Sequence, residues 1–444
     1  MIKKFFRKTM DSLGPYEKKP HLAVAVSGGS DSICLALLVK EWIDNKGGKI
    51  TALIVDHGLR KNSDEECKKT QIILEEQGIP YHCFKWNLLN IPKKGIQNKA
   101  REFRYSIFDD WCFSNNVKNL LVAHHFEDQK ETFIMRLNDN SNVYGLACMP
   151  KILFKEKLRI LRPLLDIKKK EIIKFLNKNN INWMEDPTNK SMKYFRNRIR
   201  KILPKLENEG LTDNKLKKML KKAQKERKSI ENRFNLWFKK NVKINNFGYA
   251  IVDFNNLRLL KKEDFIFIFS RILNTISGSL YLPKSKYVYN FFKKIKSNLI
   301  FDRFNLGGCH VIFFKKKLYV AREIFKKKRE HKIDFKFNKI IWDNRFEINY
   351  KNNYELFLKK KLGKSFFIDQ LKQSGWEKIL LKNNKFKELE IPNKIILSLP
   401  AVKNKKNDVL YVPHLKYYSN IKSKKEFSNM GFLFKPVKLL PNIY

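Results

Sequence analysis

The sequence predicts an α/β protein: a doubly wound, mostly parallel sheet comes first, followed by a basic helical domain and a small α+β C-terminal domain. Two observations lead to this prediction. Short apolar segments alternate with amphipathic segments through the first 140 residues, and basic charge is concentrated behind them. Regular strand–helix alternation favours a parallel sheet, because each crossover helix returns the chain to the same sheet edge. We predict domains at residues 1–205, 206–330 and 340–444, with a lysine-rich linker around residues 325–340.

The predicted elements can be placed from their apolar spacing. Residues 21–26 form a continuous apolar run that ends at two glycines, which is typical of a buried strand. Ser63 and Glu66 have the spacing of a capping box at a helix start. In the front part we predict strands at 21–26, 49–56, 81–86 and 119–124, and helices at 31–42, 63–78, 97–114 and 127–137. Behind it we predict helices at 214–240, 263–276 and 287–295, a hairpin at 311–314 and 317–321, and strands at 395–399 and 409–412.

The formal net charge of +49 is unevenly distributed along the chain. Residues 1–150 hold 22 Lys and Arg against 18 Asp and Glu, which leaves 71 against 26 for residues 151–444. The strong excess of basic residues in 151–444, the back part of the chain, predicts binding to a polyanion through phosphate contacts. The alternative is a codon bias toward lysine, since the chain is also rich in Asn, Ile and Phe.

Several classes of protein are disfavoured by what the sequence lacks. No apolar run approaches the roughly 20 residues that a membrane-spanning helix needs. The first ten residues are basic but are not followed by the apolar stretch of a signal peptide. None of the six cysteines forms a CxxC pair, which argues against a zinc knuckle or a redox dithiol. We therefore expect a cytoplasmic protein without a membrane partner, whose thiols are mostly buried.

The segment Ser27–Ser32, of sequence SGGSDS, lies between the first predicted strand and helix. Two glycines let the backbone turn tightly, and the following helix directs its free N–H groups and positive dipole end at the loop. This arrangement predicts a phosphate-binding loop, and Asp31 indicates an accompanying Mg²⁺. The loop lacks the GxxxxGK[ST] pattern of a Walker loop. The alternative is an ordinary helix N-cap made by Ser and Asp.

Further polar clusters follow the other predicted strands. They read VDHGLR at 55–60, AREFRY at 100–105, AHHFEDQKET at 123–132, EDPTN at 185–189 and FRNRIR at 195–200. SGGSDS resembles the pyrophosphate-loop (PP-loop) signature of the N-type ATP pyrophosphatases. The whole set, in this order from about Val24 to Arg200, is similar to the tRNA(Ile)-lysidine synthetase family. Beyond Arg200 the likeness is general, with Ile391-Pro392 and Leu399–Val402 as loose matches.

The resemblance implies a defined reaction. ATP adenylates the C2 oxygen of the wobble cytidine in the CAU anticodon of an isoleucine tRNA and releases pyrophosphate. The ε-amino group of free L-lysine then displaces AMP, which leaves lysidine. The resemblance also implies that the chain can form a homodimer. The ATP-binding candidates are Ser27, Gly28, Gly29, Ser30, Asp31, Ser32, Asp56 and His57, with Mg²⁺ held at Asp31. The alternative role of Asp56 and His57 is to form a turn with the glycine that follows them.

The candidate catalytic residues are Asp31, Asp128, Glu131 and His124. Asp128 and Glu131 lie three apart on a predicted helix and so share a face, where they could hold a metal or a lysine ammonium. Their alternative role is to satisfy the helix dipole. His124 or Asp128 could accept the proton that the lysine nucleophile loses. Arg101 and Arg104 could clamp a carboxylate or phosphate, unless they are solvated surface arginines.

Basic residues behind the front part are candidates for tRNA binding. Residues 214–240 predict an amphipathic helix with lysines away from its apolar face, which could lie along an RNA backbone. Binding to a membrane surface is its alternative. The tRNA-binding candidates are Arg196, Arg198, Arg200, Lys218, Lys222 and Lys225. The three arginines could neutralise phosphates of ATP or of tRNA, and their alternative is an ordinary basic helix surface.

Three rival functions stay open at this point. A tRNA thiolase of the same superfamily would need catalytic cysteines or an iron–sulfur ligand set. A GMP or NAD synthetase fits the loop but explains neither the basic back part nor the HHFEDQ cluster. A non-catalytic RNA-binding module is disfavoured by the intact acids Asp31, Asp128 and Glu131.

Overall fold

The computed structural model describes residues 1–56, 58, 63–85, 96–155, 158–185, 192, 195–279, 281–297, 303–325, 331–332, 339–350, 366–436 and 440. The chain forms two compact units, Met1–Ser229 and Ile230–Tyr444, and each is described by itself. Their boundary falls inside helix α9 (Asp213–Asn241), and the three-part division predicted from the sequence stays a prediction. Within the described residues, no helix is both long enough and apolar enough to cross a bilayer.

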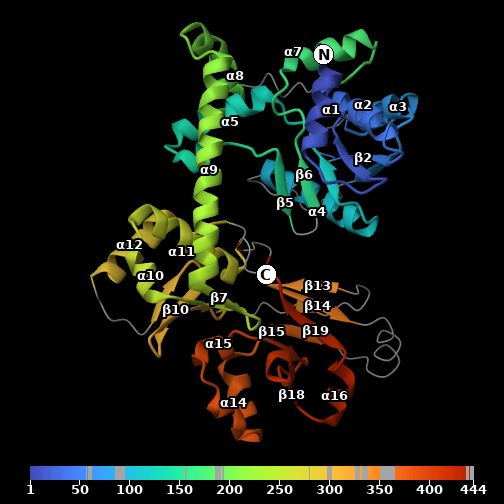
Figure 1. Cartoon of the computed structure of the whole chain (residues 1–444). Coiled ribbons are helices and arrows are strands. Elements are labelled where there is room, and N and C mark those ends of the chain that lie inside the picture. Colours follow the sequence, from blue (N-terminus) through green and yellow to red (C-terminus); the bar gives the residue numbers. More distant parts are fainter. Residues whose placement is uncertain are drawn as a thin grey trace. The chain divides into compact units, whose positions relative to one another are not determined.

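The first unit is built on a six-stranded sheet of order β3-β2-β1-β4-β6-β5 (Figure 1). All neighbouring strands pair in parallel except β5, which runs antiparallel to β6 at the edge. The predicted doubly wound, mostly parallel sheet is therefore confirmed. The strands are β1 (His21–Val26), β2 (Lys49–Asp56), β3 (Tyr81–Lys85), β4 (Asn119–Leu121), β5 (Ile152–Lys155) and β6 (Leu158–Leu161).

Helices cover both faces of this sheet, because the side chains of its strands alternate between two apolar clusters. Along β1, Leu22 and Val24 join the core on one face, which also contains residues of α1, α2, α3 and α7. Ala23 belongs to the core on the other face, together with Phe108 of α4. The helices are α1 (Ile2–Ser12), α2 (Ser30–Asp44), α3 (Ser63–Glu76), α4 (Ile96–Ser114), α5 (Phe126–Asn138), α6 (Val143–Leu146), α7 (Lys169–Lys178) and α8 (Phe195–Asn208).

The strand order reverses at β1, which has β2 on one side and β4 on the other. Val24 of β1 pairs with Leu121 of β4, so the segments that leave these two strands emerge side by side. Ligands of doubly wound sheets bind beyond the carboxyl ends of the strands at such a reversal. The SGGSDS loop follows β1 and the AHHFEDQ segment follows β4, which places both predicted clusters at this point.

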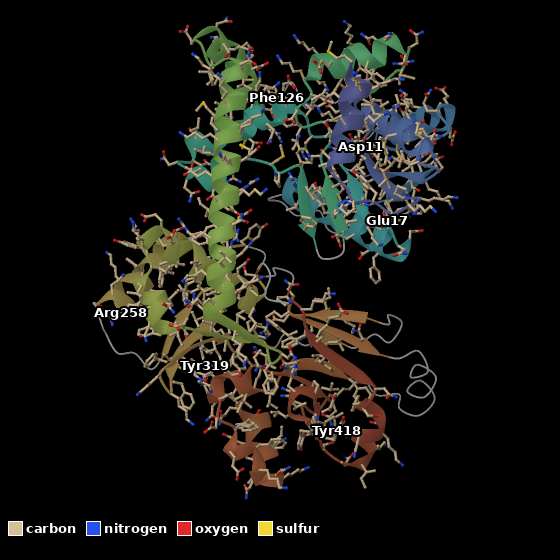
Figure 2. All side chains as sticks on the ribbon, viewed as in Figure 1. Asp11, Glu17, Phe126, Arg258, Tyr319 and Tyr418 are labelled. Carbon is tan, nitrogen blue, oxygen red and sulfur yellow. The ribbon has the colours of Figure 1, made fainter. Side chains whose placement is uncertain are left out.

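The start of α9 is held on α5 within the first unit. Phe126 and Phe133 of α5 pack against Leu216 and Leu220 of α9, and Phe126 is labelled in Figure 2. At the end of this contact, Asp213 Oδ1 accepts from Lys130 Nζ at 2.7 Å. The apolar face predicted for α9 is thus confirmed, and Lys218, Lys222 and Lys225 are exposed.

The described residues of the second unit form three antiparallel sheets. The first has order β7-β8-β11-β10-β9, with α11 (Lys262–Ser277) contributing to its core. The other two have orders β12-β15-β16-β17-β18 and β13-β14-β19. The strands are β7 (Val242–Asn245), β8 (Tyr249–Val252), β9 (Arg303–Leu306), β10 (Cys309–Phe314), β11 (Lys317–Arg322), β12 (His331–Lys332), β13 (Lys339–Trp342), β14 (Phe346–Tyr350), β15 (Phe367–Gln370), β16 (Pro400–Lys403), β17 (Val409–Val412), β18 (Tyr417–Tyr418) and β19 (Met430–Phe434). The remaining helices are α10 (Phe254–Leu259), α12 (Ser285–Lys296), α14 (Lys372–Lys382), η2 (Asn384–Glu388), α15 (Asn393–Leu397), η3 (Pro413–Leu415) and α16 (Ile421–Phe427).

Three sequence predictions differ from this structure. The strand predicted at 395–399 is wrong: Asn393–Leu397 is helix α15, and the strand starts only at Pro400. Ile395, Ile396 and Leu397 are all buried, and a short apolar run buried on every side cannot be assigned to helix or strand by periodicity. The strand predicted at 119–124 ends at Leu121. Of the sheet β7-β8-β11-β10-β9, only the β10–β11 hairpin was predicted. Strand β12 lies inside the segment predicted as a linker.

Candidate active site

The SGGSDS loop closes on itself through the Ser32 side chain. Ser32 Oγ accepts from the backbone N–H of Ser27 at 3.1 Å and donates to the carbonyl of Gly29 at 3.0 Å. Gly29 is the N-cap of α2, and its extended backbone leads directly into the first turn. The loop therefore presents the N-terminal end of a buried helix to the point where the sheet order reverses, as an anion site requires.

Gly28 is the residue that lets this loop form. Its φ of +81° lies in the left-handed region that side chains disfavour. A Cβ at Gly28 would lie 2.1 Å from Met184 Cε and 2.5 Å from Thr70 Oγ1. The backbone N–H of Met184 also donates to the carbonyl of Gly28 at 3.0 Å. The loop is thus packed between α3, which carries Thr70, and the segment that follows α7.

Asp31, in the first turn of α2, faces two cationic side chains. Its Oδ1 accepts from Lys169 Nζ at 2.6 Å, and its Oδ2 lies 3.5 Å from His125 Nε2. Lys169 Nζ also donates to Ser30 Oγ at 2.7 Å. Burial opposes ionisation, but the His125 hydrogen bond and the charges of His125 and Lys169 lower the pKa of Asp31 below its usual value. Lys169 is therefore placed to add positive charge to the phosphate loop.

His125 links the loop to the start of α5. Its Nδ1 lies 2.9 Å from Glu127 Oε2, and Glu127 Oε2 also accepts from the backbone N–H of Lys169 at 2.8 Å. The backbone N–H of His125 donates to Asp128 Oδ2 at 3.0 Å, so Asp128 serves as a helix cap. Burial alone would lower the pKa of His125, but bonding to Asp31 and Glu127 and the charge of Asp128 raise it to about 10.

This raised pKa predicts a pH dependence of stability. A histidine whose pKa is higher in the folded than in the unfolded chain stabilises the fold fully below pH 6.5, the ordinary value. That contribution declines as the pH rises and is lost through about pH 10. In thermal unfolding without added divalent metal, His125→Gln should flatten the fall of Tm between pH 6.5 and 10. Equal slopes for the variant and the parent protein would contradict the assignment.

The neighbouring His124 is neutral, whereas His125 is protonated. Burial is the largest influence on it, and together with the charges of Arg162, Arg101 and Arg196 it outweighs Asp128 and lowers the pKa of His124 to about 4. Its buried Nδ1 has no hydrogen-bond partner among the described residues. His124 is therefore neutral near pH 7 and can accept a proton, although only as a weak base.

Asp128 and Glu131 share a face of α5, as predicted, and meet two arginines of α8. Asp128 Oδ1 accepts from Arg196 Nη2 at 2.8 Å. Glu131 accepts from Nε of both Arg196 and Arg200, and its side chain is only 1% exposed. Arg196 and Arg200 were predicted to meet phosphates. In this structure their guanidinium groups meet carboxylates instead, and their role in RNA binding stays a prediction.

The other predicted site residues lie in three places. Asp56, at the end of β2, accepts from the N–H of Gly58 at 2.9 Å, as in its alternative role in a turn. Arg101 and half-buried Arg104 lie on α4. The charge of Arg101 acts on His124, and its guanidinium lies 5.7 Å from the Tyr105 ring centroid. Arg198 donates to the carbonyl of Met192 at 3.1 Å. His57 and most of the EDPTN motif, residues 186–189, lie outside the described residues.

Three residues of the site were not singled out from the sequence. Lys169 stands in a run of three lysines, and nothing distinguishes it there from a solvated lysine. His125 lies inside the HHFEDQ cluster, but its spacing does not separate it from His124. Arg162 directly follows β6, a strand absent from the sequence prediction. A polar residue at a parallel strand end is a usable signal, so predicting β6 would have indicated Arg162.

Comparison with known proteins agrees with this geometry. The PP-loop domain family matches residues 1–206. Three relatives extend the similarity over nearly the whole chain. The chain is 30% identical to the tRNA(Ile)-lysidine synthase of Orientia tsutsugamushi (strain Boryong) over 97% of this chain and 96% of that protein. It is 32% identical to the tRNA(Ile)-lysidine synthase of Rickettsia bellii (strain RML369-C), covering 90% of each, and 30% identical to that of Wolbachia pipientis wMel, covering 93% and 92%.

The doubly wound sheet and the loop after β1 define an ATP-using PP-loop enzyme. The similarity to the three synthases covers far more than this domain. The chain belongs to the tRNA(Ile)-lysidine synthase family, and it is an ATP-dependent enzyme that modifies tRNA. The thiolase and the non-catalytic module considered from the sequence are accordingly not favoured.

Proposed function

We propose that this enzyme adenylates the C2 oxygen of the wobble cytidine in a CAU-anticodon isoleucine tRNA and replaces AMP with free L-lysine. In the first step that oxygen attacks the α-phosphorus of ATP and pyrophosphate leaves. In the second step the ε-nitrogen attacks C2, the C2–O bond to AMP breaks, and the nitrogen loses a proton. The observation that carries the proposal is the loop Ser27–Ser32 beside Lys169, which is arranged for a leaving pyrophosphate.

In the first step, the backbone of Ser27–Ser32 and the N-terminal end of α2 would receive the β and γ phosphates. Lys169, 2.7 Å from Ser30 Oγ, would add a positive charge where negative charge develops. Protonated His125 would keep Asp31 and Glu127 in place beneath the loop. Because these groups are fixed before substrate binds, little reorganisation accompanies the reaction.

In the second step, the amine needs acidic groups that hold it near the electrophile and a group that takes its proton. Asp128 has one oxygen on Arg196 and the other on the backbone of His125, so it would act through its charge. His124 is neutral, and its Nδ1 has no hydrogen-bond partner in the described ranges of the chain, which makes it the proposed proton acceptor. Asp31, Asp128, Glu131 and His124 thus form the proposed catalytic group.

The residues present suit a Mg²⁺ ion that arrives with ATP. Mg²⁺ prefers oxygen ligands and is commonly held by one or two carboxylates together with substrate phosphates. Asp31 supplies such a carboxylate, whose oxygens here face Lys169 and His125. When bound, the ion neutralises phosphate charge. Asp31→Asn should raise the Mg²⁺ concentration for half-maximal activity about tenfold. An unchanged Mg²⁺ dependence would exclude Asp31 as a ligand.

The basic regions are the proposed tRNA contacts. Exposed Lys218, Lys222 and Lys225 lie along α9, away from the face that packs on α5. The proposed division of labour places catalysis in residues 1–205 and tRNA binding in 206–330, with 340–444 assisting. The proposed setting is the cytoplasm, where tRNA, ATP and free lysine occur together. Homodimer formation completes the proposal, and sedimentation of the purified protein tests it.

The central test uses two readouts in one reaction. The enzyme is incubated with ATP, Mg²⁺, labelled L-lysine and a CAU-anticodon isoleucine tRNA transcript. Label should stay in the RNA after mild alkaline deacylation, and pyrophosphate should appear only when RNA is present. A transcript with uridine in place of the wobble cytidine is the matched control. If RNA triggers pyrophosphate release but retains no label, the lysine step is wrong while adenylation stands. If neither signal appears, the proposed function fails.

A further inference from the structure

Two cysteine side chains from different elements meet where α3 packs on β3. Cys67 lies on α3 and Cys83 on β3, and their Sγ atoms are 2.9 Å apart. The two residues are 16 positions apart in the sequence, so no CxxC motif indicates them. The absence of CxxC argued against a redox dithiol, but the fold brings two thiols together by tertiary contact instead.

The contact between these two sulfurs is closer than ordinary packing. Non-bonded carbon atoms pack at about 3.5–4.0 Å, and sulfur is larger than carbon. At 2.9 Å the two Sγ atoms are already inside that distance. Gln71, on the next turn of α3, donates from its Nε2 to Cys67 Sγ at 3.3 Å and holds the sulfur on this side of the helix. The two thiols are therefore placed for bond formation without rearrangement of the chain.

The two thiols differ in their access to solvent. Cys67 is 8% exposed, whereas Cys83 is partly exposed. Burial, followed by the hydrogen bond with Cys83, raises the pKa of Cys67 to about 12, so Cys67 remains a thiol. Cysteines that respond to oxidants are accessible and stand next to a second cysteine that resolves the oxidised form. Cys83 thus has the position of the thiol that meets an oxidant, and Cys67 that of its resolving partner.

The pair lies beside two parts of the proposed ATP site. Thr70 follows Cys67 by one turn of α3, and its Oγ1 lies 2.5 Å from the position of a Cβ on Gly28 in the phosphate loop. Asp56 ends β2, the strand that pairs with β3, and its charge acts on Cys67. A disulfide is only about 2.05 Å long, so its formation draws α3 and β3 together. Because α3 meets the loop without spare room, that movement disturbs the loop.

We propose that Cys67 and Cys83 form a reversible disulfide when the enzyme meets hydrogen peroxide, and that this bond weakens ATP binding. The Cys83 sulfur first attacks a peroxide oxygen: an S–O bond forms, the O–O bond breaks, and the other oxygen leaves as water with the thiol proton. The Cys67 sulfur then displaces the hydroxyl from Cys83: the S–S bond forms, the S–O bond breaks, and the Cys67 proton leaves with the hydroxyl as a second water. The sulfurs together lose two electrons, which reduce one peroxide to two waters, and a dithiol reductant reverses the bond.

The test follows the bond and ATP binding separately in the full chain. The reduced enzyme is treated with hydrogen peroxide, the excess is removed with catalase, and free thiols are blocked before peptide mass spectrometry. A peptide linked through Cys67 and Cys83 should appear. Calorimetric titration with ATP and Mg²⁺ should give a Kd about tenfold higher than for the reduced enzyme, since small displacements at a preorganised site have effects of that order or larger. Dithiothreitol should reverse both changes. The inference uses ATP binding alone and is independent of the lysine step.

Cys83→Ser should bind ATP as the reduced parent does and should not respond to peroxide. Cys148→Ser is the matched control, because Cys148 is also partly exposed but its Sγ donates to the Leu146 carbonyl at 3.3 Å. This variant should respond to peroxide as the parent does. Absence of the linked peptide would overturn the inference, and a linked peptide with an unchanged Kd would overturn the effect on ATP. An equal loss of ATP binding in oxidised Cys83→Ser would assign that loss to another oxidised residue and reject the pair as its cause.

Discussion

Gly28→Ala should reduce RNA-dependent pyrophosphate release about 1,000-fold, the upper range for removing a preorganised anion site. The new Cβ would stand 2.5 Å from Thr70 Oγ1, which cannot easily retreat because it donates to the Glu66 carbonyl at 2.8 Å. Met184 Cε, at 2.1 Å, can move because it ends a flexible side chain. The backbone at φ +81° would also be strained. The loop must therefore open, which displaces the N–H groups proposed to receive pyrophosphate.

Gly47→Ala is the control variant, because it introduces backbone strain at a glycine outside the loop Ser27–Ser32. Gly47 has a φ of +59°, and nothing lies within 4 Å of its Cβ position. This variant should lose about 1 kcal/mol of stability through the left-handed conformation alone and keep its activity. Pyrophosphate release and thermal unfolding are measured for both variants. Activity within tenfold of the parent in a folded Gly28→Ala protein would show that the loop does not work as described.

Glu131→Gln should lower Tm by about 5 °C. Removing a buried carboxylate from two partly exposed arginines costs about 2 kcal/mol, and a unit of this size loses about 2–4 °C per kcal/mol. Glu131 is 1% exposed and receives two guanidinium groups, those of Arg196 and Arg200. Both arginines come from α8, so the substitution loosens α8 from α5. Activity should fall about 100-fold, since small displacements of catalytic groups have effects of that order. Arg196 bonds both Glu131 and Asp128, so a displaced Arg196 would also weaken its hydrogen bond to Asp128.

Glu171→Gln removes the same charge from an exposed position on α7 and should change Tm by less than about 1 °C. The double variant Glu131→Gln/Arg200→Met closes a mutant cycle. Because Glu131→Gln already weakens the contacts between Glu131 and Arg200, replacing Arg200 should cost less free energy of unfolding in this variant than in the parent protein. Full additivity of the two changes in free energy of unfolding would mean that the Glu131–Arg200 contact contributes nothing.

The sequence predicted the parts of this structure that depend on local pattern. β1 and β2 coincide with the predicted strands, because each is an apolar run bounded by glycine or polar residues. The loop Ser27–Ser32 was predicted to bind phosphate because two glycines between a strand and a helix have few other uses, and the structure does place it between β1 and α2. Asp128 and Glu131 were placed on one helical face by their spacing alone, and both do contact Arg196.

The partners of these residues could not be predicted, because they come from distant segments. Glu131 meets Arg200 across 69 residues, and Asp31 meets Lys169 across 138. No periodicity specifies which lysine in a basic run reaches a carboxylate. The different protonation states of His124 and His125 likewise follow from tertiary surroundings. His124 is buried near arginines, whereas His125 faces three carboxylates. Local sequence therefore indicated the functional groups but not their pairing.

The bond between Gly28 and Met184 gives the phosphate loop an intrinsic optical reporter. Trp183 precedes Met184 and packs on the apolar core that also contains β1 and α2. Any movement of the loop that stretches the 3.0 Å bond from Met184 N–H to the Gly28 carbonyl also shifts the indole next to it. Nucleotide binding should thus change tryptophan emission in the unlabelled enzyme. Trp183→Phe identifies that component among the seven tryptophans.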